Sequence, residues 1–419
     1  MMFNLEHENH RYKVYLNTPE LGVQHCGTFQ IREKGAQVKG ISFKYNRDYI
    51  EQPKAFPIDP ALLRLHSDER LLIDAEVAPG FLDDYLPDEW GRKVLTNFYS
   101  RKERKSFDAN KISDMLSVLG SSRIGALSIV PYDQEEPPEY IGGAGGEKLE
   151  QAELAAQQLD TGDFESLTFD DASLVFLSSH GTGVGGARPK ALINDNGIEY
   201  LVKFNRSTDP YNMARTEHAC LLMAKALGIC NARSHVRTSI NNRELLMQER
   251  FDVVNGSRRH MITINALLKE PITQRDSGLT FTYDKIADLL AQYSSQIDED
   301  LEQLVTQMLF NRAIHNTDDH ERNFSLWHNG EGYSLTPSYD MVPTLDTGSY
   351  HAASFGYSAF PPKPSELSLQ PIKIFGLSKT EVKAISEKVV STVNNWRAYA
   401  EQAGLDEENS SKVERVFCA

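Results

Sequence analysis

Two acids and an asparagine in the C-terminal half of the chain stand at a spacing that could support chemistry. Residues 316–323 read Asn-Thr-Asp-Asp-His-Glu-Arg-Asn, and residues 338–340 read Ser-Tyr-Asp. A phosphotransferase needs a carboxylate to accept the proton of the attacking hydroxyl, and an amide and a second carboxylate to hold Mg²⁺ on the nucleotide. We therefore interpret Asp318 as the catalytic aspartate, and Asn323 and Asp340 as metal ligands.

A hairpin is predicted to bring the two metal ligands together. The apolar run that starts at Asn323 and the run over residues 333–340 read as two strands, with Asn329-Gly330 as the turn between them. Such a hairpin places Asn323 and Asp340 side by side, which suits two ligands of one Mg²⁺. His320 joins the catalytic set as a hydrogen-bonding brace of the loop rather than as the base. The alternative is a solvated acidic loop, against which the apolar strand at Asn323 argues.

A glycine-rich stretch upstream is the candidate phosphate loop. Residues 178–190 read Ser-Ser-His-Gly-Thr-Gly-Val-Gly-Gly-Ala-Arg-Pro-Lys, with four glycines within six positions. Glycine lets backbone N–H groups approach phosphate oxygens without obstruction by side chains. We assign nucleotide binding to Gly183, Val184, Gly185 and Gly186. A flexible turn is the alternative, and the Walker A pattern is absent.

A lysine inside an apolar strand is the candidate partner of the nucleotide phosphates. Lys203 lies in Tyr-Leu-Val-Lys-Phe, where a buried ammonium is unfavourable unless it meets an opposite charge. In a kinase a helix glutamate holds this lysine against the phosphates, and Glu217 in the following helix fits that role. The alternative is an edge-strand lysine that faces solvent. Glu249 and Phe251 end the next strand, where a kinase hinge would contact adenine.

Hydrophobic periodicity gives a coarse order of elements. A linker rich in Pro, Gly and acid covers residues 131–146. Strands are predicted at residues 12–16, 26–31, 38–43, 123–130, 191–193, 199–204 and 245–251. Helices are predicted at residues 83–99, 111–119, 147–159, 213–227, 301–314 and, as one long final helix, 379–402.

Composition excludes several classes of protein. The 419 residues carry a net charge of −15, with 40% hydrophobic and 25% charged residues, as in ordinary globular proteins. No apolar run is long enough to span a membrane, and the N-terminus has no apolar signal core, so we expect a cytoplasmic protein. The four cysteines are scattered without paired spacing, which indicates neither disulfides nor a zinc site. The acidic charge argues against nucleic-acid binding through the overall field.

These motifs together resemble the HipA family, the serine/threonine-kinase toxins of bacterial type II toxin–antitoxin systems. The resemblance rests on Gly-Gly-Ala-Arg-Pro-Lys, Tyr-Leu-Val-Lys-Phe, Glu-Arg-Phe-Asp, the motif at residues 316–323, and Leu-Thr-Pro-Ser-Tyr-Asp. In the N-terminal half, Leu-Pro-Asp-Glu-Trp-Gly-Arg at residues 86–92 and Arg-Ile-Gly-Ala-Leu at 123–127 are also similar to the family. The likeness therefore covers nearly the whole chain.

The resemblance implies an α+β, two-lobed fold like that of protein kinases, with a β-rich N-terminal subdomain and a mostly helical C-terminal lobe. It places the HipA N-terminal subdomain at 1–132, a linker at 133–147, the rest of the N-lobe at 148–252 and the catalytic lobe at 253–419. It implies ATP and Mg²⁺ as cofactors and a serine or threonine of an aminoacyl-tRNA synthetase as acceptor. It also implies a HipB-like helix-turn-helix antitoxin, through which the protein reaches DNA only indirectly.

By the same resemblance, Asp318, Lys203, Asn323 and Asp340 take the catalytic, phosphate-binding and metal-binding roles, and Glu249 and Phe251 contact adenine. One position departs from the family. Gly183 stands where members commonly carry an autophosphorylated serine, so that self-inactivation would move to Thr182, with Ser178 or Ser179 as second choices.

Two other classes of function stay open. One is a catalytically silent homologue that acts as a binding partner of a helix-turn-helix protein, and the other is a small-molecule kinase. The complete set of site residues argues against the first, and the N-terminal resemblance argues against the second.

Overall fold

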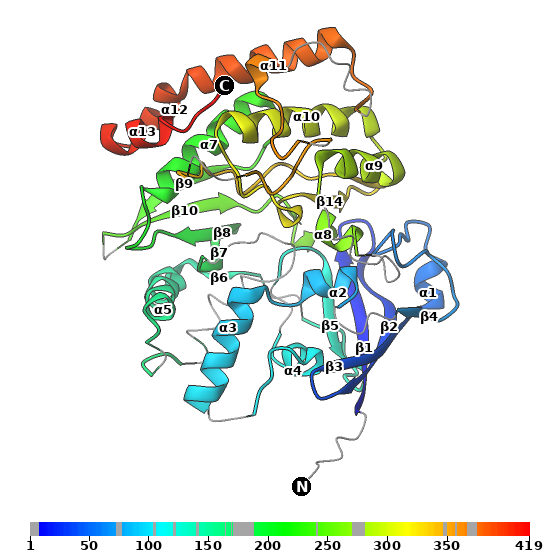
Figure 1. The fold of residues 1–419 in the computed structure, drawn as a ribbon. Coiled ribbons are helices and arrows are strands. Elements are labelled where there is room, and N and C mark those ends of the chain that lie inside the picture. Colours follow the sequence, from blue (N-terminus) through cyan, green and yellow to red (C-terminus); the bar gives the residue numbers. More distant parts are fainter. Residues whose placement is uncertain are drawn as a thin grey trace. The chain divides into compact units, whose positions relative to one another are not determined.

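A computed structural model describes residues 8–72, 78–103, 106–119, 123–139, 142–163, 165–168, 170, 188–239, 242–269, 281–346, 350–356, 358–366 and 375–419 (Figure 1). The chain forms two compact units. Unit 1 contains Met1–Leu201, Asp252–Arg275 and Trp327–Glu331, and unit 2 contains Val202–Phe251, Asp276–Leu326 and Gly332–Ala419. The chain therefore passes between the units several times, and strands β8 (Ile198–Phe204) and β14 (Ser325–His328) each contain such a crossing.

Unit 1 is built on an antiparallel sheet with the strand order β4-β3-β2-β1-β5. Its strands are β1 (Glu8–Thr18), β2 (Gly22–Lys34), β3 (Gln37–Tyr45), β4 (Arg70–Leu72) and β5 (Leu127–Pro131). The three predicted N-terminal strands and the closing strand are thus confirmed. Alternate residues face the core, where Phe29 and Phe43 meet the ring of Phe81 at centroid distances of 6.3 and 5.7 Å.

The helices of unit 1 agree with the prediction only in part. They are α1 (Arg47–Ile50), α2 (Gly80–Tyr85), α3 (Glu89–Asn97), α4 (Ile112–Leu116), α5 (Leu149–Thr161) and α8 (Ile264–Leu267). Helix α5 has the predicted length, whereas α4 is shorter than predicted. A π-helical turn, Phe98–Glu103, follows α3. The single helix predicted over residues 83–99 is wrong, because the backbone becomes extended at Leu86, as it commonly does before a proline such as Pro87.

A second set of strands follows the linker. Within unit 1, β6 (Ala144–Gly145) pairs in parallel with β7 (Lys190–Asp195), and β7 neighbours the start of β8. Asn196 and Gly197 connect β7 to β8 with φ values of 52° and 82°, as a type I′ hairpin turn requires. The strands predicted at residues 191–193 and 199–204, on either side of this turn, are therefore confirmed. Unit 1 also contains β11 (Val253–Val254), β12 (Ser257–Arg258) and β13 (Met261–Thr263).

Unit 2 contains strands that are covered by a helix. The rest of β8 neighbours β10 (Glu244–Glu249), which pairs with β9 (Ser234–Thr238), a strand the sequence did not predict. Helix α7 (Met213–Leu227) packs on β9 and β10 (Figure 1). Its bounds agree with the prediction because both caps are written in the sequence: the Asn212 side chain accepts from the N–H of Arg215, and Gly228 ends the helix at φ 87°.

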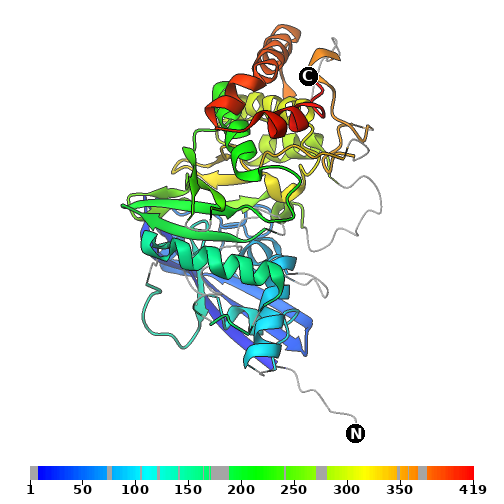
Figure 2. The ribbon, with the colours of Figure 1, turned by 90° about the vertical axis from the view of Figure 1, so that its left-hand side faces the viewer.

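The helical part of unit 2 consists of α9 (Tyr283–Tyr293), α10 (Ile297–Ala313), α11 (Lys379–Asn394), α12 (Trp396–Gln402) and α13 (Glu407–Glu414). Helix α10 packs against α9 and α11, which lie beside it in both ribbon views (Figure 1 and Figure 2). The prediction of one long final helix over 379–402 is wrong. The helix breaks at Asn395, and a separate helix, α12, begins at Trp396. Trp396 is buried, and its indole N–H donates to the carbonyl of Ser410 in α13.

The predicted hairpin after the acidic motif is confirmed. Strands β14 and β15 (Tyr333–Leu335) are neighbours, and Gly330 in the connection has a φ of 100°. Asn323 does not begin the strand as predicted, because it ends a 3₁₀ turn, Glu321–Asn323. Among the described helices, none combines the length and apolar character needed to cross a bilayer.

Candidate active site

A buried lysine with two carboxylate partners forms the electrostatic centre of unit 2. The Lys203 ammonium on β8 lies 2.5 Å from Glu217 Oε1 on α7 and 2.7 Å from Asp340 Oδ1. Burial lowers the pKa of Lys203, but Asp340 and Glu217 outweigh it, and the pKa ends above its usual range. The lysine is therefore charged, and the predicted Lys203–Glu217 pair is confirmed.

Backbone geometry aims Asp340 at this lysine. Asp340 follows β15 and has a φ of 56°, in the left-handed region that non-glycine residues other than Asn and Asp seldom adopt. Such conformations persist where the surrounding structure holds them, and they are common at functional sites. Here the hydrogen bond from the Ser338 N–H to the carbonyl of Ile229, at 2.8 Å, fixes the segment just before Asp340.

The catalytic loop leaves α10 and exposes Asp318. His315 ends the helix at a φ of 57°, which turns the chain into the loop. The Asp318 side chain is 72% exposed. His320 accepts a hydrogen bond from the Arg322 N–H at Nδ1, and its Nε2 lies 4.0 Å from Asp318 Oδ1. These contacts suit the role of a brace for the loop.

The Asn323 side chain offers an unused oxygen. Its amide nitrogen donates to the carbonyl of Asp318 at 2.7 Å, whereas Oδ1 is buried and has no hydrogen-bond partner. A buried acceptor without a partner is costly, and an amide oxygen is a normal ligand of Mg²⁺. The residues present therefore fit a magnesium ion. Because no cluster of three or more His, Cys, Asp or Glu within the described ranges could hold a metal by itself, substrate phosphates would have to complete the coordination.

Tyr339 connects the two predicted metal ligands. Its hydroxyl lies 2.6 Å from Ser325 Oγ and donates to the carbonyl of Arg322 at 3.0 Å. These bonds anchor the residue before Asp340 to the residues on either side of Asn323. Tyr339 thus connects the segment that contains Asn323 to the segment that contains Asp340. No signal in the sequence indicated this role of the tyrosine.

A buried network below the catalytic loop was also missed. The Asp319 carboxylate is fully buried and accepts from the Tyr283 hydroxyl at 2.8 Å and from the Ala353 N–H at 3.1 Å, and it lies 2.9 Å from His351 Nδ1. Burial, followed by the charge of Asp319, raises the pKa of Tyr283 well above its usual value, which keeps this hydroxyl a donor. Asn311 on α10 bonds to Tyr283 at 3.1 Å and extends the network.

Two adjacent aspartates therefore have different environments, one exposed and one buried. The sequence carried one signal of this difference: two aspartates stand next to each other at 318 and 319, although a phosphotransfer site needs only one of them as the base. Which acid is buried depends on Tyr283 and His351, which lie 36 and 32 positions away from Asp319.

The predicted hinge residues are only partly brought to this centre. The Phe251 ring stacks near that of Tyr339, with centroids 6.2 Å apart. Glu249 ends β10, donates its N–H to the carbonyl of Arg233 at 2.7 Å, and has its carboxylate 3.9 Å from the Arg233 guanidinium. The glycine-rich residues Gly183, Val184, Gly185 and Gly186, and the hydroxyl residues Ser178, Ser179 and Thr182, lie outside the described residues.

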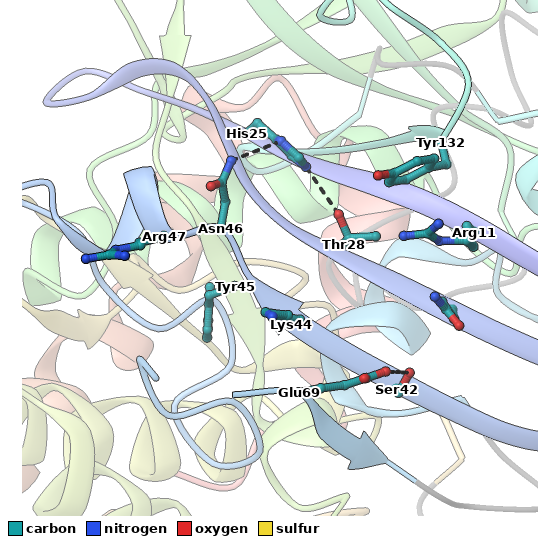
Figure 3. A pocket seen from close by; sticks show the side chains of 11 residues that line it. Arg11, His25, Thr28, Ser42, Lys44, Tyr45, Asn46, Arg47, Glu69 and Tyr132 are labelled. Atoms are coloured by element: carbon teal, nitrogen blue, oxygen red, sulfur yellow. Dashed lines mark hydrogen bonds between the residues drawn. The ribbon is translucent and has the colours of Figure 1, made fainter. Parts of the chain in front are cut away.

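Unit 1 contains a polar pocket of about 390 Å³ on the outer face of its sheet (Figure 3). Arg11 and Lys44 line it, and the Arg11 guanidinium lies 3.9 Å from the centre of the Tyr132 ring. Its one carboxylate, Glu69, accepts a hydrogen bond from the Ser42 hydroxyl at 2.6 Å. This pocket lacks the paired metal ligands of a phosphotransfer centre, so the candidate active site is the group around Lys203.

Comparison with known families covers both halves of the chain. Residues 182–397 match the family model described as HipA-like C-terminal domain, and residues 20–130 match the one described as HipA N-terminal domain. The first match alone extends over half of the chain and contains the residues of the candidate active site.

Individual relatives are more distant. "Putative kinase Y4mE" of Sinorhizobium fredii is 24% identical over 389 residues, which are 87% of this chain and 81% of that protein. "Toxin YjjJ" of Escherichia coli is 28% identical over 179 residues, and the match covers 39% of each chain. A chain in the solved complex of HipA, HipB and operator DNA from Shewanella oneidensis MR-1 superposes with a TM-score of 0.66 at 19% identity, covering 97% of this chain and 94% of that one. This match confirms the predicted α+β fold.

Proposed function

Because this chain belongs to the HipA family, we propose that it is a serine/threonine-protein kinase of the toxin type, which transfers the γ-phosphate of ATP to a protein hydroxyl. We propose an aminoacyl-tRNA synthetase as the acceptor, with inhibition of translation as the result. The matches to a kinase and a toxin by name, and to a toxin–antitoxin complex in structure, support this assignment.

One observation carries the proposal. A charged, buried Lys203 is held between Glu217 and Asp340, while the Asn323 oxygen is buried without a partner. A structural ion pair alone would not need a second carboxylate in the left-handed region, nor an unsatisfied oxygen beside an exposed aspartate. Phosphate oxygens and a divalent cation would satisfy each of these groups.

The roles of the residues follow from their placement. Lys203, oriented by Glu217, would hold phosphate oxygens, and Asp318 would accept the proton of the acceptor hydroxyl. The amide nitrogen of Asn323 fixes the loop carbonyl of Asp318, and its buried oxygen would ligate the metal. Mg²⁺, when bound, supplies neutralisation of the phosphate charge.

A transfer assay tests the function directly. Purified protein is incubated with ATP labelled at the γ-phosphate, Mg²⁺ and each aminoacyl-tRNA synthetase of the host in turn. We expect label on a serine or threonine of one synthetase, and no label with Asp318→Ala. Nucleotide binding without transfer to any synthetase or other host protein would instead support the catalytically silent homologue.

We propose a HipB-like helix-turn-helix protein as partner. The solved complex that resembles this chain contains HipB and operator DNA, and the net charge of −15 fits a protein that leaves the phosphate contacts to its partner. Co-purification with the product of a neighbouring gene, followed by operator binding with and without this chain, tests the partnership.

Removal of a metal ligand should change the metal dependence of nucleotide binding. We expect wild-type protein to bind ATP tightly only with Mg²⁺, and Asp340→Ala to lose this dependence, because the carboxylate both ligates the metal and balances Lys203. Titration calorimetry with and without Mg²⁺ measures the effect. Asn323→Ala serves as a second ligand variant that leaves the lysine pair intact. Equal Mg²⁺-dependent affinity in wild type and in both variants would defeat the metal assignment.

Self-inactivation should act on the glycine-rich stretch. A phosphate there adds nearly two negative charges where the ATP phosphates bind, so a modified loop could not stay closed over nucleotide. With glycine at position 183, we propose Thr182 as the acceptor, and Ser178 or Ser179 as second choices. Phosphopeptide mapping after incubation with Mg²⁺ and ATP is the test. Phosphate confined to sites outside residues 178–182 would remove this mechanism.

A further inference from the structure

An exposed aromatic pair stands beside the catalytic loop. Tyr350 is 68% exposed, the highest value among the exposed large apolar side chains in the described part of the chain. Its ring lies 5.1 Å from that of Phe360, which is itself 37% exposed. A tyrosine ring exposed to this extent gains little folding stability from burial, and its face is available for contact with another molecule.

Backbone hydrogen bonds fix this pair close to Asp318. The Ala352 N–H donates to the carbonyl of Thr317 at 3.0 Å, and the Ala353 N–H donates to the Asp319 carboxylate at 3.1 Å. The segment thus contacts the residues on both sides of Asp318. Tyr350 is two residues before Ala352, and two residues of extended chain span at most about 7 Å. The aromatic pair is therefore within the reach of a short peptide whose hydroxyl meets Asp318.

An arginine, Arg312, lies beside the aromatic pair of Tyr350 and Phe360. The Arg312 guanidinium, in the last turn of α10, lies 5.2 Å from the centre of the Phe360 ring. Arg312 forms no ion pair within the described ranges, and its Nε is buried with no hydrogen-bond partner. A guanidinium in this state can bind a carboxylate or a main-chain carbonyl of an incoming chain.

From this placement we propose that Tyr350, Phe360 and Arg312 select the acceptor segment of the protein substrate. Tyr350 and Phe360 contact an apolar side chain close to the phosphorylated residue, and Arg312 binds an acidic residue of the same segment. The position next to Asp318, and a guanidinium that forms no ion pair with the described residues, favour this occupant. This assignment rests on the proposed kinase function, and it adds the class of acceptor sequence that the kinase recognises.

A peptide array gives the direct test. Peptides with one serine or threonine carry leucine, phenylalanine or glycine at each neighbouring position, and glutamate, glutamine or lysine in a second series. We expect wild type to favour apolar and acidic neighbours. Tyr350→Ala should raise KM for the apolar series about tenfold with little change in kcat, because the lost contact is one face of a ring. Peptides with glycine should be unaffected.

Matched variants separate the contributions. Tyr350→Phe keeps the ring and should retain the apolar preference, whereas Arg312→Gln should lose only the preference for acidic neighbours. Thermal unfolding and Mg²⁺-ATP affinity of Tyr350→Ala should equal those of wild type, because the side chain is exposed. The same KM measurement on an intact protein substrate covers the case in which short peptides are poor acceptors.

The outcomes distinguish this assignment from the proposed function. If wild type transfers phosphate but Tyr350→Ala keeps the full apolar preference and the same KM, the assignment is overturned and the kinase function stands. If wild type transfers phosphate to no peptide and no protein, the kinase function fails and the assignment falls with it.

Discussion

Replacement of Asp318 by alanine is expected to lower the rate of phosphoryl transfer by a factor of about 10² to 10⁴, with nucleotide affinity and fold unchanged. The side chain is 72% exposed, so its removal leaves no buried cavity. Proton acceptance acts mainly in the transition state, so the loss appears in the rate rather than in binding. Single-turnover transfer, nucleotide titration and thermal unfolding on the same preparation measure the three quantities.

Asp319, the residue next to Asp318, provides a matched control. Asp319→Asn changes one carboxylate to an amide of nearly the same size, but that carboxylate is buried among Tyr283, His351 and the Ala353 N–H. We expect this variant to lose about 1–3 kcal/mol of stability. If Asp318→Ala kept near-wild-type transfer while a folded Asp319→Asn lost it, the two aspartates would have been assigned the wrong way round.

Lys203→Met should produce the largest combined loss of stability and binding. Methionine keeps most of the length of the side chain but removes the ammonium that the buried Glu217 and the half-buried Asp340 contact. Breaking a buried ion pair by removal of one partner costs about 3–5 kcal/mol. Affinity for Mg²⁺-ATP should fall as well, because methionine offers no positive charge to the phosphates. Chemical denaturation and calorimetry give the two values.

A double variant tests whether charge is the cause. Lys203→Met combined with Glu217→Gln removes the charge of one of the two carboxylates that contact Lys203, so we expect it to regain part of the stability that Lys203→Met loses. It should not regain nucleotide binding. If Glu217→Gln lowered the stability of Lys203→Met by as much as it lowers that of wild type, the two residues would act independently. The buried pair would then not explain the loss of stability.

The elements that the sequence predicted well are those whose limits are written locally. Helix α7 begins at Asn212 and ends at Gly228, and the β7–β8 turn contains Asn196 and Gly197, so a cap or turn residue marks each boundary. The break at Asn395 was missed because it follows from the burial of Trp396 against α13, a contact between separate elements. Local periodicity carries no information on such packing.

The candidate site shows the same division. Lys203 and Glu217 were predictable as a pair, because a lysine in an apolar strand demands an acid nearby. The bond from Lys203 to Asp340 was not, since it depends on a left-handed φ at Asp340 and on a separation of 137 positions. The burial of the Asp319 carboxylate likewise depends on partners from α9 and from the segment around His351.

The places where the chain crosses between its two units have a mechanical consequence. One crossing follows Leu201, two residues before Lys203, another falls directly after Phe251, and a third follows Leu326, three residues after Asn323. Each of these proposed binding residues therefore lies within three residues of a point where the backbone enters or leaves unit 2. Their main-chain positions thus depend on how the chain is held on both sides of each crossing, and not on the packing of unit 2 alone.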